Sequence, residues 1–106
     1  MSNYDWLDNI PPGWVTIGRK MIQEIEKINP NFEIADMKEK WGALRVYGHN
    51  EDDPTYEIIR KYEKQSAHIC CRCGGPATKY SRGYILPWCD TCGEDEEKYY
   101  IRFNKD

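Results

Sequence analysis

The stretch Cys70–Cys92, CCRCGGPATKYSRGYILPWCDTC, holds all five cysteines of the 106-residue chain. Four of them form two C-x-x-C pairs, Cys70 with Cys73 and Cys89 with Cys92, and fifteen residues separate the pairs. This spacing is typical of a zinc site with four thiolates, because one tight turn can aim both sulfurs of a pair at a single ion. The sequence therefore predicts a four-cysteine zinc ribbon or knuckle over residues 70–92, with a hairpin between the two pairs.

Three other roles for these thiols fit the sequence less well. Two disulfides would need an oxidising compartment. The first residues, MSNYDWLDNIPPGW, have neither a basic start nor an apolar run and do not form a secretion signal. A redox centre would need one C-x-x-C beside a βαβ pattern, and iron–sulfur clusters use other spacings. We therefore expect a zinc protein of the cytoplasm.

The fifth thiol, Cys71, could replace Cys70 only through a C-x-C pair with Cys73, which is tighter than the usual turn. We interpret Cys71 as a spare thiol that packs in the core. Four cysteine ligands close the coordination shell, whereas a catalytic zinc usually keeps one open position for water. The zinc is accordingly predicted to be structural and to fold a segment that is too small to fold alone.

Two amphipathic helices and a β-hairpin are expected before the cysteines. Apolar residues at steps of three and four indicate a helix over 13–28 and a second one over 54–68, with Asp53 as the N-cap of the second. Alternation over 32–47 indicates a hairpin that turns at Trp41-Gly42, although residues 37–40 could instead form a helical turn. The inner stripe of the first helix is Trp14, Ile17, Met21, Ile25 and Ile28; that of the second is Ile58, Ile59, Tyr62, Ser66 and Ile69.

Acidic residues after Gly93 predict a last short helix, because carboxylates favour the first turn of a helix. The whole chain is thus interpreted as one small α+β domain with the zinc ribbon built in. Its expected parts are a helix–hairpin–helix unit over 13–69, the zinc ribbon over 70–92 and a short C-terminal helix over 93–106.

The composition argues against several classes of function. The net charge is −3 with histidine neutral, whereas nucleic-acid-binding proteins are usually basic. No stretch of the sequence approaches the roughly 18 apolar residues of a membrane helix. The chain has no GxSxG, Walker, GxGxxG or HExxH motif, and we predict that it is not an enzyme. Aromatic residues reach 13%, which is enough to build a small core and an exposed binding face.

The order of four motifs resembles that of a group of small zinc-ribbon proteins that phages and prophages carry. The motifs are GWVTIGRKMIQEI (13–25), IADMKEKWGALRVYG (34–48), EKQSAHICCRCG (63–74) and GYILPWCDTC (83–92). The block KEKWGALRVY (38–47) is the most specific; Ala43 and Val46 stand where the group often has Gly and Phe. The resemblance implies no activity. It implies an accessory role in the cytoplasm of a bacterial host cell, such as host takeover or the countering of defence systems.

Three functional hypotheses follow. The first is a non-enzymatic protein that binds a host protein and inhibits a bacterial defence factor, because Tyr and Trp are frequent anchors of interfaces and acidic runs can occupy basic grooves. Its candidate residues are Trp41, Arg45, Tyr47, Arg82, Tyr84, Glu94, Asp95, Glu96 and Glu97.

The alternative hypothesis is a nucleic-acid-binding zinc ribbon in transcription or phage regulation, because basic residues interleaved with aromatic ones can hold phosphates and stack bases. It adds Lys38, Lys40, Arg72, Lys79 and Tyr80 to the basic and aromatic candidates. The third hypothesis is an assembly part, a homodimer that associates through the apolar patch of residues 99–103.

Overall fold

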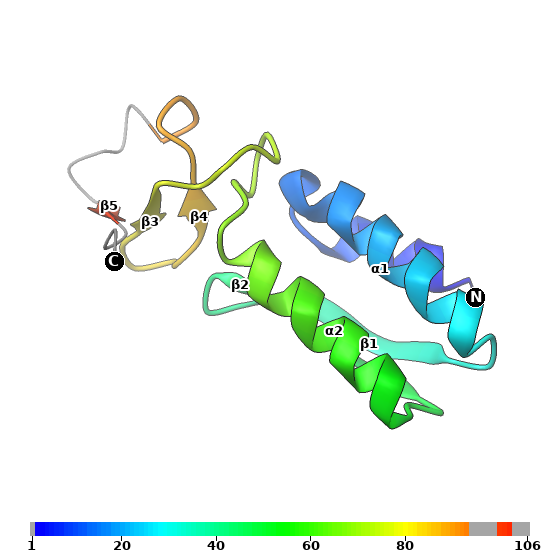
Figure 1. Cartoon of the computed structure of the whole chain (residues 1–106). Coiled ribbons are helices and arrows are strands. Elements are labelled where there is room, and N and C mark those ends of the chain that lie inside the picture. The colour runs from blue at the N-terminus through cyan, green and yellow to red at the C-terminus, as the bar shows by residue number, and fades with distance from the viewer. Residues whose placement is uncertain (1, 94–99, 103–106) are drawn as a thin grey trace.

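The computed structural model describes residues 2–93 and 100–102 (Figure 1). These residues contain two α-helices, two 3-10 helices and two antiparallel sheets, joined by loops. In chain order they are η1 (Asn3–Asn9), η2 (Pro12–Trp14), α1 (Val15–Ile28), β1 (Glu33–Lys40), β2 (Ala43–His49), α2 (Asp53–Ser66), β3 (Lys79–Ser81), β4 (Pro87–Trp88) and β5 (Tyr100–Arg102). One sheet pairs β1 with β2, and the other has the strand order β4-β3-β5. This is the predicted α+β fold, with the cysteine segment at its C-terminal end.

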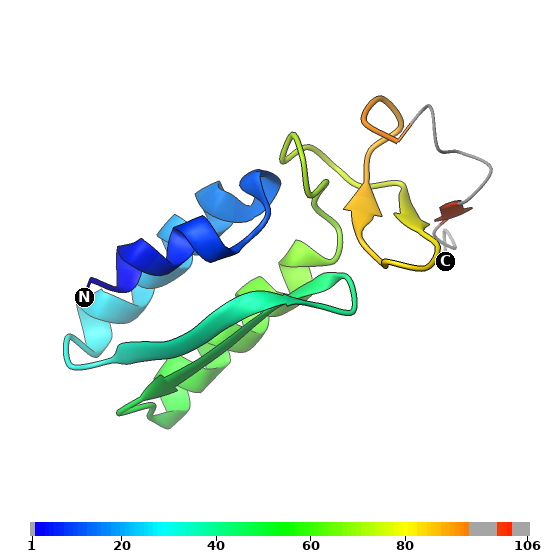
Figure 2. The same cartoon turned by 180° about the vertical axis from the view of Figure 1, so that it is seen from behind.

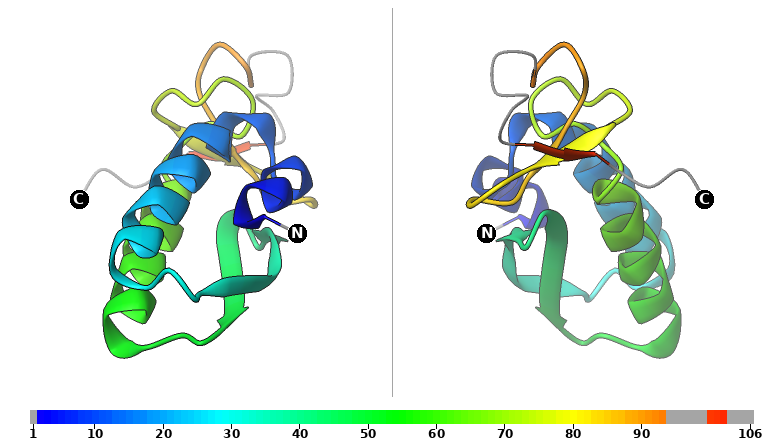
Figure 3. Two further views of the ribbon diagram at one scale, coloured as in Figure 1. Left: turned by 90° about the vertical axis from the view of Figure 1, so that its right-hand side faces the viewer. Right: turned by 90° about the vertical axis from the view of Figure 1, so that its left-hand side faces the viewer.

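A closed ring of five elements surrounds the core. α1 packs against α2, α2 against β2, β2 pairs with β1, β1 packs against η1, and η1 returns to α1. Figure 3 shows the two α-helices on one side of this ring and the hairpin with η1 on the other. Because a two-stranded hairpin is marginally stable by itself, the hairpin depends on the elements that flank it.

Side chains from α2 and η1 complete hydrogen bonds at the two hairpin edges. Along β2, the backbone N–H of Leu44 donates to Ser66 Oγ at 2.7 Å and that of Val46 donates to Glu63 Oε2 at 3.0 Å. Along β1, Asn3 Oδ1 accepts from the N–H of Ile34 at 2.8 Å. Polar side chains therefore take the place of the neighbouring strands that a larger sheet would have, and they cover edge groups that could otherwise pair with another chain.

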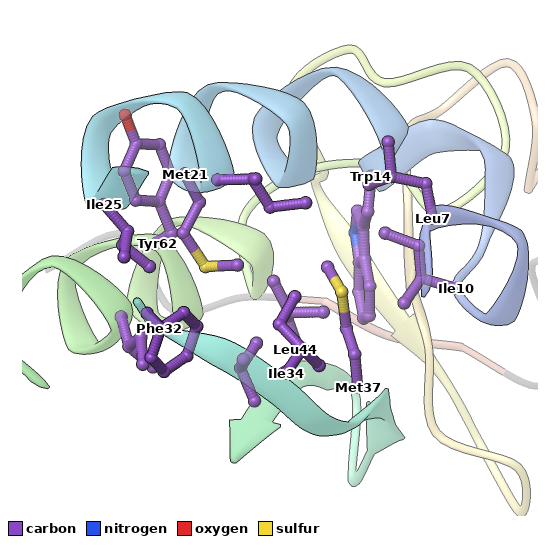
Figure 4. Packing of buried hydrophobic residues seen from close by; sticks show 13 residues of the cluster. Leu7, Ile10, Trp14, Met21, Ile25, Phe32, Ile34, Met37, Leu44 and Tyr62 are labelled. Carbon is purple, nitrogen blue, oxygen red and sulfur yellow. The ribbon is translucent and has the colours of Figure 1, made fainter. Parts of the chain in front are cut away.

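The core lies inside the ring, between the helices and the inner face of the hairpin (Figure 4). Trp14, Met21, Met37 and Leu44 are all fully buried there. A strict alternation would turn Asp36 inward, but the strand register shifts between Ile34 and Asp36. This bulge places Met37 in the core and leaves Asp36 half-buried, because an extra residue reverses the faces of the strand beyond it.

Several sequence predictions are confirmed and several need correction. The hairpin turns at Trp41-Gly42, and residues 37–40 are strand rather than a helical turn. The N-cap of α2 is Asp52, whose carboxylate accepts from Thr55 N, and not Asp53. Ile28 is 51% exposed because it lies in the last turn at the edge of the stripe, and Ile22 is buried in the core instead.

The C-terminal helix predicted over 93–106 does not include Tyr100–Arg102. These residues form β5, which pairs antiparallel with β3. Pairing with a free strand edge far away in the sequence overrides the local helical preference here. Residues 94–99 and 103–106 lie outside the described part of the chain, so the remainder of that prediction stays a prediction.

Replacement of Ser66 by Ala tests the edge-capping role of α2. The change leaves the buried N–H of Leu44 without its acceptor, and we expect a loss of about 1–3 kcal/mol in the free energy of unfolding. Urea unfolding followed by circular dichroism measures this loss. The exposed neighbour Gln65→Ala serves as a control and should change stability by no more than about 0.5 kcal/mol. Equal stability of Ser66→Ala and wild type would contradict the role.

Candidate metal centre

Two short turns with matching hydrogen bonds carry the four ligand candidates. In the first, the N–H of Gly74 donates to the carbonyl of Cys70 at 3.0 Å, and in the second the N–H of Gly93 donates to the carbonyl of Cys89 at 3.0 Å. Gly74 has φ +81°, in the left-handed region that glycine adopts without steric cost. Gly74 therefore lets the backbone curl back around the sulfurs of the first pair.

Backbone N–H groups in each turn also point at cysteine sulfur. Gly75 N lies 3.4 Å from Cys73 Sγ, and Cys92 N lies 3.3 Å from Cys89 Sγ. Such N–H donors stabilise a thiolate, because hydrogen bonds to the charged form favour ionisation. The two turns thus supply both the sulfur atoms and part of the environment that a metal-bound thiolate requires.

The four sulfurs converge on one point. The Sγ atoms of Cys70, Cys73, Cys89 and Cys92 all lie within 4.8 Å of one another, and the Cys73 and Cys89 sulfurs are 3.6 Å apart. A tetrahedral ion with bonds of about 2.3 Å, as zinc forms with thiolates, places its sulfurs about 3.8 Å apart. The arrangement therefore fits a single metal ion, and the predicted ligand set comes together in space.

The four thiols influence one another's ionisation. Burial alone would raise the pKa of the Cys70 thiol, but backbone N–H groups, led by that of Cys73, lower it to about 6. The hydrogen bond with the Cys89 sulfur raises the pKa of Cys92 to about 12, and the negative charge of Cys70 adds to this. A bound cation would let several thiolates coexist at such short distances, because it replaces their mutual repulsion by attraction.

Cys71 does not belong to the cluster. It is buried, its backbone N–H donates to the carbonyl of Pro87 at 2.9 Å, and burial raises the pKa of its thiol to about 12. The Cys71 sulfur is not among the four that converge, so this residue acts as a small, buried apolar side chain and not as a metal ligand. Its burial agrees with the prediction of a spare thiol that packs inside the molecule.

The first cysteine turn is attached to the helical part by Gly13 and Trp14. The N–H of Gly13 donates to the carbonyl of Cys71 at 2.8 Å, and Trp14 Nε1 donates to the carbonyl of Ile69 at 2.9 Å. A methyl group on Gly13 would overlap the carbonyl oxygen of Cys70. Only glycine fits at this position, so the start of α1 and the metal turn are in direct backbone contact.

The ribbon hairpin joins the second cysteine pair to the same framework. The N–H of Ser81 donates to the carbonyl of Leu86 at 3.0 Å, which closes the loop between β3 and β4. Trp88, next to Cys89, lies under the guanidinium of Arg72, with the Arg72 Cζ atom 5.7 Å from the ring centroid. The cation–π contact connects the segment after Cys71 to the strand that leads to Cys89.

The candidate partner-binding residues fall into different places. Trp41 and Tyr84 are 75% and 72% exposed and line one hollow, although they come from different hairpins. Tyr47 is 52% exposed on β2, and Arg82 is exposed in the β3–β4 loop. Arg45 is half-buried and lines a separate hollow between β2 and α2. The remaining candidates, Glu94, Asp95, Glu96 and Glu97, lie outside the described residues.

Sequence reasoning missed Glu39, which connects the two hairpins. Its Oε2 atom accepts from the N–H of Gly42 at 2.9 Å. It also lines the same hollow as Tyr84, and the interaction of its carboxylate with the Tyr84 hydroxyl raises the pKa of Tyr84. Residues 39 and 84 are far apart in the chain, and no local pattern marks them as neighbours.

Comparison of the chain with models of known protein families, with curated proteins and with solved structures finds no match. The resemblance to phage zinc-ribbon proteins therefore rests on the motifs alone. Within residues 2–93 and 100–102, no helix combines the length and the apolar character needed to cross a bilayer.

The metal centre makes a specific prediction for two nearby cysteines. The purified chain should bind one divalent metal ion, and Cys73→Ser should abolish this stoichiometric binding because an alcohol is a much poorer ligand than a thiolate. Cys71→Ser should retain the ion. Titration with Co²⁺, followed by the absorption bands of tetrahedral thiolate coordination, measures both variants. Loss of the ion in Cys71→Ser together with retention in Cys73→Ser would refute the ligand assignment.

The contact at Gly13 predicts that Gly13→Ala weakens both folding and metal binding. The added methyl group pushes against the Cys70 backbone, and overpacking of this kind costs about 1–3 kcal/mol. Gly83→Ala is the matched control: it has φ +77° but no atom within 4 Å of the added carbon. It should cost about 1 kcal/mol of backbone strain and leave the metal affinity unchanged. Competition with a chromogenic chelator measures the metal affinity of the two variants.

Proposed function

We propose that the ion is zinc and that its role is structural. Four thiolates are the ligand set that zinc prefers in structural sites, and they leave no position for a reacting water. The sulfurs lie in loops with little apolar surface of their own, so the ion supplies the cross-link that these loops lack. The protein is accordingly a binding protein and not an enzyme.

We further propose that the chain is a phage accessory protein that binds a host protein and so inhibits a bacterial defence factor. The observation that carries the binding role is the pair Trp41 and Tyr84. Two large aromatic side chains stand exposed around one hollow, at the tips of two hairpins, and such residues dominate the binding energy of many interfaces. The motif order supports the phage context, and the net charge of −3 suits a basic target.

A second candidate function, nucleic-acid binding, has one observation in its favour. The hollow between β2 and α2 is lined by Arg45, Arg60 and Lys64, together with two alanines. Three cations around a concave surface can hold phosphates. Glu63 lines the same hollow and opposes anion binding, and the overall negative charge does so at longer range. Protein binding is therefore the better-supported function.

Capture from a bacterial lysate separates these functions. The tagged, zinc-loaded chain is used as bait, with and without nuclease, and retained proteins are identified by mass spectrometry. We expect one dominant protein that survives nuclease and is lost with Trp41→Ala, whereas Gln65→Ala retains it. Loss of all retained proteins upon nuclease treatment would favour the nucleic-acid role instead, and Arg45→Glu should then abolish binding to a DNA column.

A further inference from the structure

Trp41 occupies a backbone conformation that disfavours it. The turn between β1 and β2 has positive φ at both central residues, +56° at Trp41 and +84° at Gly42. Gly42 is required, because a side chain there would meet Ile85 and Tyr80 at 3.0 and 3.3 Å. At the Trp41 position, Asn, Asp or Gly would adopt the same conformation at lower steric cost.

Burial does not compensate for this steric cost. The Trp41 side chain is 75% exposed, so it contributes little to the core. A bulky residue held in an unfavourable conformation at the surface indicates a role outside folding. The residues that surround the Trp41 side chain at the surface therefore indicate its role.

Trp41 lines a hollow of about 170 Å³ together with Tyr84, Ile85, Gly83 and Glu39. The hollow lies where the tip of the β1–β2 hairpin meets the β3–β4 loop, and Figures 1 and 2 show these two segments next to each other. Its walls are aromatic and aliphatic. Glu39 is the charged residue among the five that line it.

Glu39 holds this arrangement in place and still has capacity to bind. Its carboxylate accepts the N–H of Gly42 at 2.9 Å, and its interaction with the nearby Tyr84 hydroxyl raises the pKa of Tyr84. A carboxylate offers about four acceptor positions, and the N–H of Gly42 occupies one of them, so positions remain for a ligand. The same side chain thus fixes the turn that presents Trp41, orients Tyr84 and places a negative charge at the hollow.

We propose that this hollow binds a cationic side chain, arginine or lysine, that projects from the partner protein. Aromatic faces attract cations through their quadrupole, and Trp is the strongest of them. A carboxylate beside the ring adds a direct ionic contact. This inference rests on the proposed function, since it names the chemistry of the partner at that surface. It adds to the proposed function by assigning the contact to Trp41, Tyr84 and Glu39.

The charge of the hollow distinguishes this ligand from a nucleic acid. Exposed aromatic residues also stack nucleobases, but such sites combine them with positive charges that follow the phosphate backbone. Here the charged side chain beside the aromatic residues is the acid Glu39. The chain as a whole carries a net charge of −3. The cations Arg45, Arg60 and Lys64 belong to the other hollow.

Titration with a matched pair of small molecules tests the proposal. N-acetyl-arginine amide carries the cation, whereas N-acetyl-citrulline amide has nearly the same shape and no charge. Both are added to the zinc-loaded, isotopically labelled chain, and NMR follows the Trp41 indole and the amides of residues 39–42 and 83–85. We expect saturable shifts with the arginine compound and binding about tenfold weaker, or absent, with the citrulline compound.

Three variants assign the effect to individual residues. Glu39→Gln keeps an oxygen for the Gly42 N–H but removes the charge, and it should weaken binding of the arginine compound about fivefold. Trp41→Asn should abolish binding while it raises the melting temperature, because Asn suits this turn. Tyr56→Ser removes another exposed aromatic side chain, on α2, and should leave binding unchanged.

Equal affinity for the two amides, absence of shifts at these signals, or unchanged binding in Trp41→Asn would each overturn the proposal. Saturable binding of oligothymidylate at the same signals, without binding of the arginine compound, would overturn it in favour of base stacking. These outcomes do not depend on the capture experiment. A protein captured through Trp41 with no preference for the cation would leave the proposed function standing and remove only this inference.

Discussion

A backbone-to-backbone contact at Gly13 connects the two halves of this molecule. The helical half is residues 2–69, and the cysteine half is residues 70–93 with 100–102. The N–H of Gly13 donates to the carbonyl of Cys71, and there is no room for a side chain between Gly13 and Cys70. The next residue, Trp14, is fully buried in the core and donates its indole N–H to Ile69. Consecutive residues thus serve the core and the metal turn, and a disturbance in one is transmitted to the other.

The two halves are stabilised by different physics. The helical half buries a cluster of large apolar side chains inside a closed ring of elements, so hydrophobic burial dominates there. The cysteine half has short strands and loops, and its four sulfurs converge on one point. Without a cation those sulfurs repel one another once ionised, whereas with one they become a strong cross-link of the segment. The close contact at Gly13 lets the half with the apolar core support the half that lacks one.

A second contact between the halves, away from Gly13, creates the surface that we assign to binding. The β1–β2 turn belongs to the helical half and the β3–β4 loop to the cysteine half, and Glu39 connects them through Gly42 and Tyr84. The Trp41 hollow is therefore formed by residues of both halves. A rigid surface of this kind lowers the entropy lost when a partner binds.

The sequence by itself determined whatever depends on short-range spacing. Two C-x-x-C pairs specified the ligand set, the steps of three and four predicted both helices, and Trp41-Gly42 marked the turn. Three details differ from the prediction by one residue or one turn: the strand positions near the bulge, the end of the helical stripe at Ile28 and the N-cap at Asp52. Neighbouring elements decide such details.

Only the tertiary structure decided the long-range contacts. Asn3 and Ser66 complete the edges of a hairpin from opposite sides, Tyr100–Arg102 becomes a strand because β3 has a free edge, and Glu39 reaches Tyr84 from another hairpin. In each case the partner lies far away in the chain, and local periodicity contains no information about it. The four cysteines that converge could therefore be predicted from the sequence, whereas the surface around Trp41 forms only where two hairpins meet.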